Sequence, residues 1–358
     1  MIKMIPINKP TIVRKDLEYV LSCLVTEKLE EGELTQEFEK KIAAKVGTKY
    51  SIAVNSFTSG LHLALLGLGI GKDDEIIIPA YADASILNAL NYVGAIPVPV
   101  DVEMDSYNID FKQAQKRVSS KTKAIILTHN FGIPADIEQF LTIDVTVIED
   151  CSYAFGAEYH SELKKENKNV GSFGLVSIFS FDTDCIITTG NGGMILSNSR
   201  DLMSKIKKLK YNPSRKLQEY NISFDYRMAD ISSALGLSQL KIIDKFIERR
   251  RELANFYDNK FMKSKYKIYR EITNRKNVYG KYTILVEGNI ERIIDYCRRH
   301  KIIVKRPIEF PIYRALGKSP EEFPNSEHLY RKLLQIPIYP ALKKKEVEII
   351  ANTLLKVL

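Results

Sequence analysis

Four aspartates of this sequence stand next to apolar runs that are typical of buried strands, and a histidine and two cysteines lie near them. If those runs lie side by side, they bring together Asp83, Asp150, Asp184 and Asp225, with His129 and either Cys151 or Cys185. Several carboxylates with one histidine suit a hard cation or general acid–base chemistry. The sequence contains no short metal-ligand spacing such as Cys-x-x-Cys, and acidic side chains usually face water or pair with Lys and Arg. An enzyme that uses these acids is therefore one hypothesis, and a solvated set of acids is the other.

Hydroxyl side chains form a second candidate site. Thr58 and Ser59 fall at the beginning of a predicted helix, where backbone N–H groups and the helix dipole favour an anion such as phosphate. Ser180 lies near the end of a predicted strand. Because the same residue types are ordinary helix N-caps, the pattern alone does not separate a phosphate site from a cap.

The elements that must position these groups follow an alternating pattern between Ser51 and about Gln239. The predicted strands are Ser51–Val54, Glu75–Pro79, Ile96–Val102, Ala124–Thr128, Thr146–Asp150, Ser177–Phe181 and Gly193–Ser197. The predicted helices between them are Thr58–Gly69, Ala84–Val93 and Phe111–Val118. Continuous apolar strands separated by helices indicate an α/β fold whose mostly parallel sheet is covered on both faces.

The pattern changes after a long helical stretch, Asp230–Arg251. The later elements are a strand over Lys281–Val286, a helix over Ile290–His300, a strand near Ile302–Lys305 and a terminal helix over Lys344–Leu358. Such a mixture is typical of a smaller α+β domain. We therefore predict a large α/β domain with an N-terminal arm over residues 1–245, and a small C-terminal domain over residues 246–358.

The bulk properties are those of an ordinary globular protein. The chain has 358 residues, of which 45% are hydrophobic and 27% charged, so it is long enough for two domains. Its net charge is +9, and the lysines and arginines are scattered along the sequence, which favours anionic small-molecule substrates over a nucleic-acid surface. Four widely spaced cysteines indicate free thiols in a reducing compartment. No signal peptide and no membrane span of roughly 18 apolar residues are predicted, so we expect a cytoplasmic protein without membrane contact.

Several motifs together resemble the DegT/StrS-type sugar aminotransferases, which depend on pyridoxal phosphate (PLP). The matching segments are Asn55–Leu65, His129–Asp136, Val147–Asp150, Gly171–Met194, Tyr226–Met228, Phe323–Glu327 and Ile336–Pro340. The resemblance covers nearly the whole chain. It implies the PLP-transferase fold type I, with a seven-stranded sheet and a dimer. It also implies transfer of an amino group from glutamate to a keto sugar carried on a nucleotide diphosphate, for surface polysaccharides.

Position 185 departs from that family. The run Phe179-Ser180-Phe181 leads, without any insertion, into Thr188-Thr189-Gly190, and the resemblance puts the Schiff-base lysine at Cys185. A thiol cannot form an imine with the aldehyde of PLP. No lysine lies between Lys168 and Lys205, so a neighbour on the same strand cannot substitute.

The resemblance also assigns the remaining positions of the cofactor pocket. Asp150 matches the acid that binds the pyridine nitrogen, and Thr58, Ser59 and Ser180 match phosphate-binding positions. The departures replace a glycine by Phe57, a ring-stacking aromatic residue by Asp83, and a partner-subunit asparagine by Asp225. Further departures are Tyr153, Phe155 and Asn191, where the family has Gln, His and Glu. Seven changes in one pocket predict weak or lost PLP binding.

Four hypotheses follow from this sequence. The leading one is a family scaffold with a degenerate PLP site that binds a nucleotide-diphosphate sugar, or acts as a partner subunit, as a homodimer or with an active paralogue. The second is altered PLP chemistry similar to that of keto-sugar dehydratases, with PLP or its amine form held non-covalently. The third is a PLP-free enzyme that reuses the cleft acids. The fourth is a transaminase whose lysine comes from elsewhere in the chain.

Overall fold

A seven-stranded sheet forms the centre of the protein. The computed structural model describes residues 4–27, 29–162, 165–211, 223–269 and 271–357. The strands follow the order β1 (Tyr50–Val54), β9 (Gly193–Ser197), β8 (Val176–Ser180), β5 (Thr146–Asp150), β4 (Thr122–Thr128), β2 (Glu75–Pro79) and β3 (Ile96–Val100). Neighbours from β8 to β3 pair in parallel, whereas β9 is antiparallel to both β1 and β8. The predicted mostly parallel sheet is therefore confirmed.

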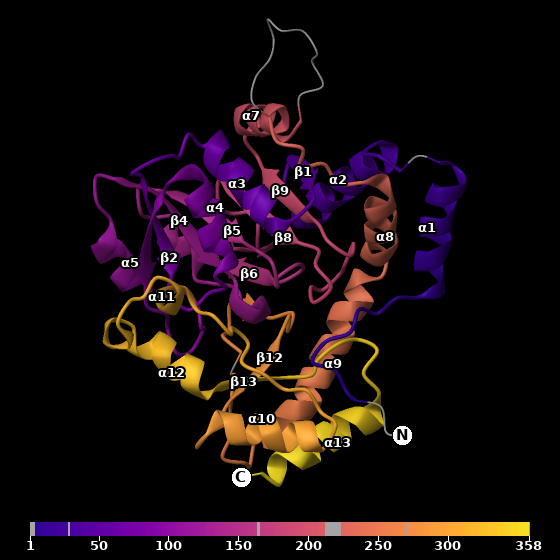
Figure 1. The fold of residues 1–358 in the computed structure, drawn as a ribbon, viewed down its shortest axis with the longest axis vertical. Helices are drawn as coiled ribbons and strands as arrows, with labels where there is room; N and C mark the ends of the chain where they lie inside the picture. Colours follow the sequence, from indigo (N-terminus) through magenta and orange to yellow (C-terminus); the bar gives the residue numbers. More distant parts are fainter. Residues whose placement is uncertain (1–3, 28, 163–164, 212–222, 270, 358) are drawn as a thin grey trace, which may run out of the picture.

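Helices cover both faces of this sheet, because its strands are apolar on both sides (Figure 1). Ile76 and Ile78 face one layer of helices, and Ile77 between them faces the other. The first layer contains α3 (Phe57–Gly67), α4 (Ser85–Val93) and α7 (Arg200–Lys210). The second contains α2 (Glu33–Val46), α5 (Phe111–Arg117), α6 (Ile137–Phe140), α8 (Asp230–Leu240) and the beginning of α9 (Ile243–Phe261).

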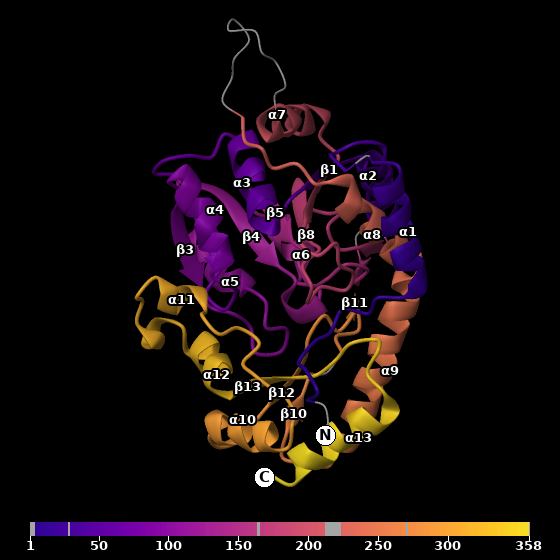
Figure 2. The same ribbon diagram turned by 45° about the vertical axis from the view of Figure 1, so that its right-hand side comes forward.

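The C-terminal third of the chain packs around a second, three-stranded sheet, below the large sheet in Figure 2. Its strands are β10 (Lys267–Ile268), β12 (Tyr282–Leu285) and β13 (Leu333–Ile336). The helices of this part are α10 (Ile290–Arg299), α11 (Ile312–Ala315), η3 (Pro320–Glu322), α12 (Pro324–Lys332) and α13 (Lys344–Leu355). A third small sheet joins β6 (Glu158–Ser161) and β7 (Glu166–Asn169) to β11 (Arg275–Lys276). The remaining elements are α1 (Arg14–Val25) and the turn η1 (Asn130–Gly132).

Two predicted elements differ from the structure. The helical stretch Asp230–Arg251 is divided between α8 and α9, because Ile242 leaves the helical conformation (φ −118°, ψ 8°). The change of direction lets Leu237 before the break and Ile243 after it reach the same core. The predicted strand at Ile302–Lys305 is also wrong. Ile302 bridges to Ile5 and Lys305 to Gln335, so the segment changes partners and forms no continuous ladder.

Helix α9 runs across the predicted domain boundary. Residue 245 lies inside α9, so the proposed boundary at 245/246 would divide one continuous helix, and the division stays a prediction. The terminal helix ends at Leu355, and Leu358 lies outside the described residues. The four cysteines are buried, and none of them forms a disulfide in the described part of the chain. None of the helices in the described part of the chain is long and apolar enough to span a membrane.

Candidate functional site

A cleft of about 280 Å³ opens at the carboxyl ends of the parallel strands. Ligands of open α/β sheets usually bind at this edge, because several strands deliver their following loops to one place. Segments after β2, β4, β5 and β8 line it, together with Phe57 and two residues from the C-terminal part. The lining residues that carry polar chemistry are Asp83, Ser85, Thr128, His129, Asn130, Asp150, Ser152, Tyr153, Ser180, Asp182, Asp184 and Lys281.

Asp150 ends β5 and points a half-buried carboxylate into this cleft. Its Oδ1 atom accepts hydrogen bonds from the Ser152 backbone N–H at 3.0 Å and from the Ser152 hydroxyl at 2.6 Å. Burial raises the pKa of the Asp150 carboxyl, and the Ser152 hydrogen bonds oppose that rise. The predicted acid therefore lies at the strand end where the sequence put it.

Asp83 and Tyr153 also lie in the cleft, as the resemblance implied. Asp83 is exposed, and it accepts the Ser85 backbone N–H at 2.9 Å. The Tyr153 hydroxyl donates to Asp184 Oδ2 at 3.1 Å. Burial is the main reason why the pKa of the Tyr153 phenol lies well above its usual range. With Asp150 and Asp182, four carboxylates share this small volume.

Cys185 does not line that cleft. Its side chain is 7% exposed and borders a separate cavity of about 10 Å³, next to the N-terminal arm at Pro10 and Thr11 and beside Arg250. Burial is the main cause that raises the pKa of the thiol far above its usual value, and Asp184 adds to the rise. The Cys185 thiol therefore stays protonated near neutral pH, which makes it a poor base or nucleophile.

The hydroxyl residues at the start of α3 are used by the helix itself. Ser56 caps the helix by accepting the Ser59 backbone N–H at 3.1 Å, and Ser59 Oγ donates to Asn55 Oδ1 at 2.6 Å. Thr58 and Ser59 do not line the cleft, whereas Phe57 and Ser180 do. The helix cap is therefore Ser56, and the predicted Ser59 hydroxyl bonds Asn55 instead of facing the cleft.

Asp225 lies on the surface of this chain, away from the cleft. Its carboxylate is 64% exposed and pairs with Arg227 at 2.7 Å, and hydrogen bonds from that guanidinium lower the pKa of Asp225. Phe155 packs in the core against Phe179, and Asn191 is exposed. Approach of Asp225 to the cleft of a second subunit stays a prediction.

One group of described residues has the spacing of a metal site: His129, Glu149 and Cys151. Its donor atoms already have protein partners. His129 Nδ1 accepts the Ala135 N–H at 3.0 Å, so Nε2 carries the proton and donates to Glu149 at 3.1 Å. The Glu149 carboxylate also accepts three backbone N–H groups. Burial keeps the pKa of the Cys151 thiol well above its ordinary value. The group is thus a structural hydrogen-bond network rather than a cation site.

Lys281 is one of the cleft residues that the sequence did not predict, together with Asp182, Ser152 and Asn130, and it is the one that carries a positive charge. It precedes β12 and is 9% exposed, yet it lines the cleft together with Asp83, Asp150 and Asp184. The signal in the sequence was a lysine at the beginning of an apolar strand, directly after a glycine. Gly280 is needed there, because a Cβ atom would lie 2.3 Å from the Tyr153 carbonyl oxygen.

These residues do not fit PLP bound in the usual way. Residue 185 offers a buried thiol that hydrogen-bonds Ser180 and cannot form an imine, the Ser56 hydroxyl caps α3, and the Ser59 hydroxyl donates to Asn55. A phosphate dianion in the cleft would meet four carboxylates and one described cation, Lys281. Repulsion between these carboxylates and a phosphate in the same small cleft opposes binding of PLP. Of the predicted cofactor positions, Asp150 and Ser180 do line the cleft.

The fold defines the class of the protein. Helicobacter pylori PseC, an aminotransferase involved in the biosynthesis of pseudoaminic acid, superposes with a TM-score of 0.91 at 26% identity, over 99% of both chains. The PLP and PMP forms of Streptococcus pneumoniae Spr1654 each give a TM-score of 0.91 at 23% and 24% identity, and cover 99% of this chain and 98% and 97% of theirs. The chain therefore has the PLP-transferase fold type I.

The sequence comparison defines the family. The model of the DegT/DnrJ/EryC1/StrS aminotransferase family matches residues 10–355. GDP-perosamine synthase of Escherichia coli O157:H7 is 33% identical over 365 residues, which cover 98% of each chain. The chain belongs to the DegT/DnrJ/EryC1/StrS aminotransferase family, a PLP-dependent family of nucleotide-sugar and polysaccharide biosynthesis.

Proposed function

We propose that this protein binds a nucleotide-diphosphate sugar in the cleft and does not carry out conventional transamination. In this proposal Cys185 occupies the position of the Schiff-base lysine, and the protein acts in nucleotide-sugar or surface-polysaccharide biosynthesis in the cytoplasm. The GDP-sugar activity in the name of the Escherichia coli relative supports the substrate class.

The observation that carries the proposal is the environment of Cys185. The thiol at residue 185 is buried, hydrogen-bonds Ser180 at the border of the cleft and faces a much smaller cavity beside Arg250, and it cannot form an imine with PLP. Arg250 is a buried cation, and a second cation at residue 185 would be placed next to it. Asp83 and Phe57 would remain in the cleft whatever residue stands at 185.

The first test is the visible absorption spectrum after incubation with excess PLP and desalting. We expect the wild type to be colourless, and the Cys185→Lys variant to bind little PLP and to show no turnover of glutamate with a GDP-linked keto sugar. Calorimetry should detect binding of a GDP-sugar to the same colourless wild type.

Two outcomes of this test would contradict the proposal. Robust turnover by Cys185→Lys would show that the pocket is intact apart from residue 185. Retained absorbance in the wild type would favour the second candidate, dehydratase-like chemistry with non-covalent PLP or its amine form, for which the retained Asp150 is the supporting observation.

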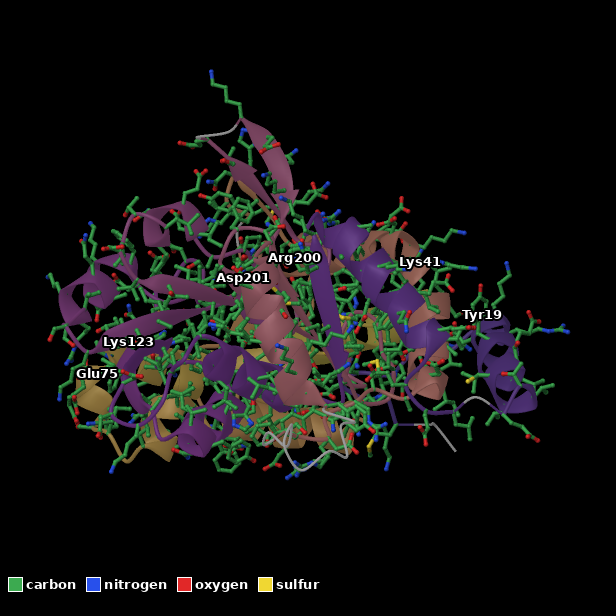
Figure 3. The ribbon with its side chains drawn as sticks, turned by 90° about the horizontal axis from the view of Figure 1, so that it is seen from above. Tyr19, Lys41, Glu75, Lys123, Arg200 and Asp201 are labelled. Atoms are coloured by element: carbon green, nitrogen blue, oxygen red, sulfur yellow. The ribbon has the colours of Figure 1, made fainter. Side chains whose placement is uncertain are left out.

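We also propose that the protein is a homodimer that uses the outer face of α1. This helix packs on α8 at one margin of the molecule, where Tyr19 is labelled in Figure 3. Several of its outward side chains are apolar: Leu17 is 62% exposed, and Leu21, Leu24 and Val25 are also exposed, beside the charged Arg14 and Glu18. Such a contiguous apolar face is costly in water and is typical of an interface.

Charges placed on that face should therefore separate the subunits. In sedimentation, we expect the wild type at twice the chain mass of 40.9 kDa and the Leu17→Glu/Leu21→Glu variant at the mass of one chain. The control is Lys123→Glu, which adds negative charge at the opposite margin of the molecule (Figure 3). A monomeric wild type would contradict the homodimer and direct the search to an active paralogue as partner.

A further inference from the structure

Lys281 is an isolated amine in the cleft. Its Nζ atom donates one hydrogen bond, to the Pro307 carbonyl oxygen at 2.9 Å, and lies 4.1 Å from the centre of the Tyr153 ring. Among the described residues it has no ion-pair partner within 4.0 Å, although Asp83, Asp150, Asp182 and Asp184 line the same cleft. An ammonium group has three donors, so a buried lysine with one accepting partner is incompletely satisfied as a cation.

The surroundings of Lys281 favour its neutral form. Burial is the main cause that lowers the pKa of Lys281 to about 8, and Lys305 lowers it further. Asp184, Asp83 and Cys185 act in the opposite direction. A neutral amine is the nucleophilic form of lysine, and desolvation in an apolar pocket is one way in which proteins produce it.

The fold fixes the backbone of Lys281 against the large sheet. The Lys281 N–H donates to the Phe131 carbonyl oxygen at 3.1 Å, and the Val278 N–H donates to that of Gly132 at 3.3 Å. Gly280 lies so close to the Tyr153 backbone that no other residue fits without displacement. The amine is therefore held at the strand ends by a rigid contact between the C-terminal part and the large sheet.

We propose that Lys281 is an imine-forming residue of this cleft, and that it condenses with the keto group of a sugar nucleotide. The nitrogen attacks the carbonyl carbon and forms a C–N bond, and the carbonyl oxygen becomes the hydroxyl of a carbinolamine. The C–O bond then breaks, and the oxygen leaves as water with the two hydrogens of the original amine. No oxidant or reductant is needed. This inference rests on the proposed function, since it requires a keto sugar in the cleft.

Protons for this step have acceptors and donors near the amine. Asp184 and Asp83 line the same cleft and act electrostatically on the ammonium, but neither lies within 4.0 Å of it, so the proton must reach a carboxylate through water or through the substrate. The Tyr153 hydroxyl already donates to Asp184, which links the phenol to the same carboxylate. A carboxylic acid formed in this way can return its proton to the departing oxygen.

Reductive trapping tests the inference. The full-length protein is incubated at pH 7.5 with cyanoborohydride and a GDP-linked keto sugar, or in parallel with PLP, and the modified lysines are mapped by mass spectrometry. We expect the keto-sugar adduct at Lys281 to exceed that at Lys305 by roughly tenfold, because a lower pKa leaves more neutral amine. Trapping should increase between pH 7 and 9. Lys281→Met and Lys281→Arg should lose the adduct while surface labelling stays unchanged.

The outcomes separate this inference from the proposed function. Binding of the GDP-linked keto sugar without an adduct above surface labelling at Lys281 would overturn the imine and leave the proposed function standing. An adduct of Lys281 with PLP but not with the keto sugar would overturn the sugar as substrate and the loss of PLP binding together. A Lys281→Arg variant that is still trapped at its former rate would show that another amine reacts.

Discussion

Replacing Lys281 with methionine should stabilise the protein at pH 7 by about 2 kcal/mol. The pKa of this lysine is lowered to about 8 in the folded protein, against about 10.4 in an unfolded chain. That difference corresponds to a penalty of about 3 kcal/mol for holding the charged amine in the folded state. Methionine has a similar length and no charge, and it forfeits about 1 kcal/mol by leaving the Pro307 carbonyl oxygen without its donor.

The pH dependence gives the sign of this effect. Below pH 8 the lysine is protonated in both the folded and the unfolded state, so the whole penalty acts on the wild type. Between pH 8 and about 10.4 the folded protein has released the proton while the unfolded chain keeps it, and the stability of the wild type rises with pH. The difference between the wild type and Lys281→Met should therefore shrink over this interval.

Urea unfolding at pH 7, 8.5 and 10 measures that difference. Lys305→Met is the matched control, since Lys305 lies near Lys281 but pairs with Glu309 at the surface. We expect the control to change stability by less than about 0.5 kcal/mol at every pH. A Lys281→Met variant that is less stable than the wild type at pH 7 would mean that the folded protein gains from a charged Lys281.

The strands of the large sheet were predictable from sequence because each one is a short apolar run that is buried on both faces. The same pattern puts the strand ends at one edge, which is why four aspartates were expected together; Asp83, Asp150 and Asp184 do lie in the cleft, whereas Asp225 lies on the surface beside Arg227. The break between α8 and α9 was not predictable from local pattern, because the residues on both sides of Ile242 favour a helix. Only packing of both helices on one core requires the turn.

The direction of a side chain beyond a strand end is harder to predict than its position in the chain. Cys185 follows β8 by five residues, and the turn that closes with its N–H on the Asp182 carbonyl oxygen takes the thiol out of the cleft. Lys281 is the opposite case, because it lies in the cleft although the sequence did not predict it there. It follows Asp184 by 97 residues and Asp83 by 198 residues in the sequence, and the close contact of Gly280 with the Tyr153 backbone helps to hold it in the cleft. The spacing of residues in the sequence predicts neither the direction of the Cys185 side chain nor the position of Lys281.

Arg250 shows how strongly the C-terminal part is held to the cleft. Its guanidinium is 1% exposed, and Nη1 donates to the carbonyl oxygens of Tyr279 at 3.0 Å, Gly280 at 3.3 Å and Ile338 at 3.1 Å. Burial is the main cause that lowers its pKa to about 10, so Arg250 remains a cation at neutral pH. The residue thus binds the backbone that immediately precedes Lys281.

Arg250→Ala should destabilise the protein by about 4 kcal/mol. Three buried carbonyl oxygens lose their donor, at about 1 kcal/mol or more for each, and the deleted side chain leaves a cavity. Removing the buried charge of Arg250 recovers part of the lost free energy of unfolding. Urea unfolding measures the change, and Lys245→Ala, an exposed position on the same helix α9, should change stability by less than about 0.5 kcal/mol.

The same variant connects stability with the chemistry of the cleft. Without Arg250 the backbone at Tyr279 and Gly280 loses its fixed position, so trapping at Lys281 should fall while labelling of surface lysines is unchanged. Arg250→Lys restores a cation but not the planar fork of donors, and we expect it to recover only part of both losses. If Arg250→Ala unfolds with the stability of the wild type, then water replaces the guanidinium at these carbonyl oxygens and Arg250 does not hold Lys281 in the cleft.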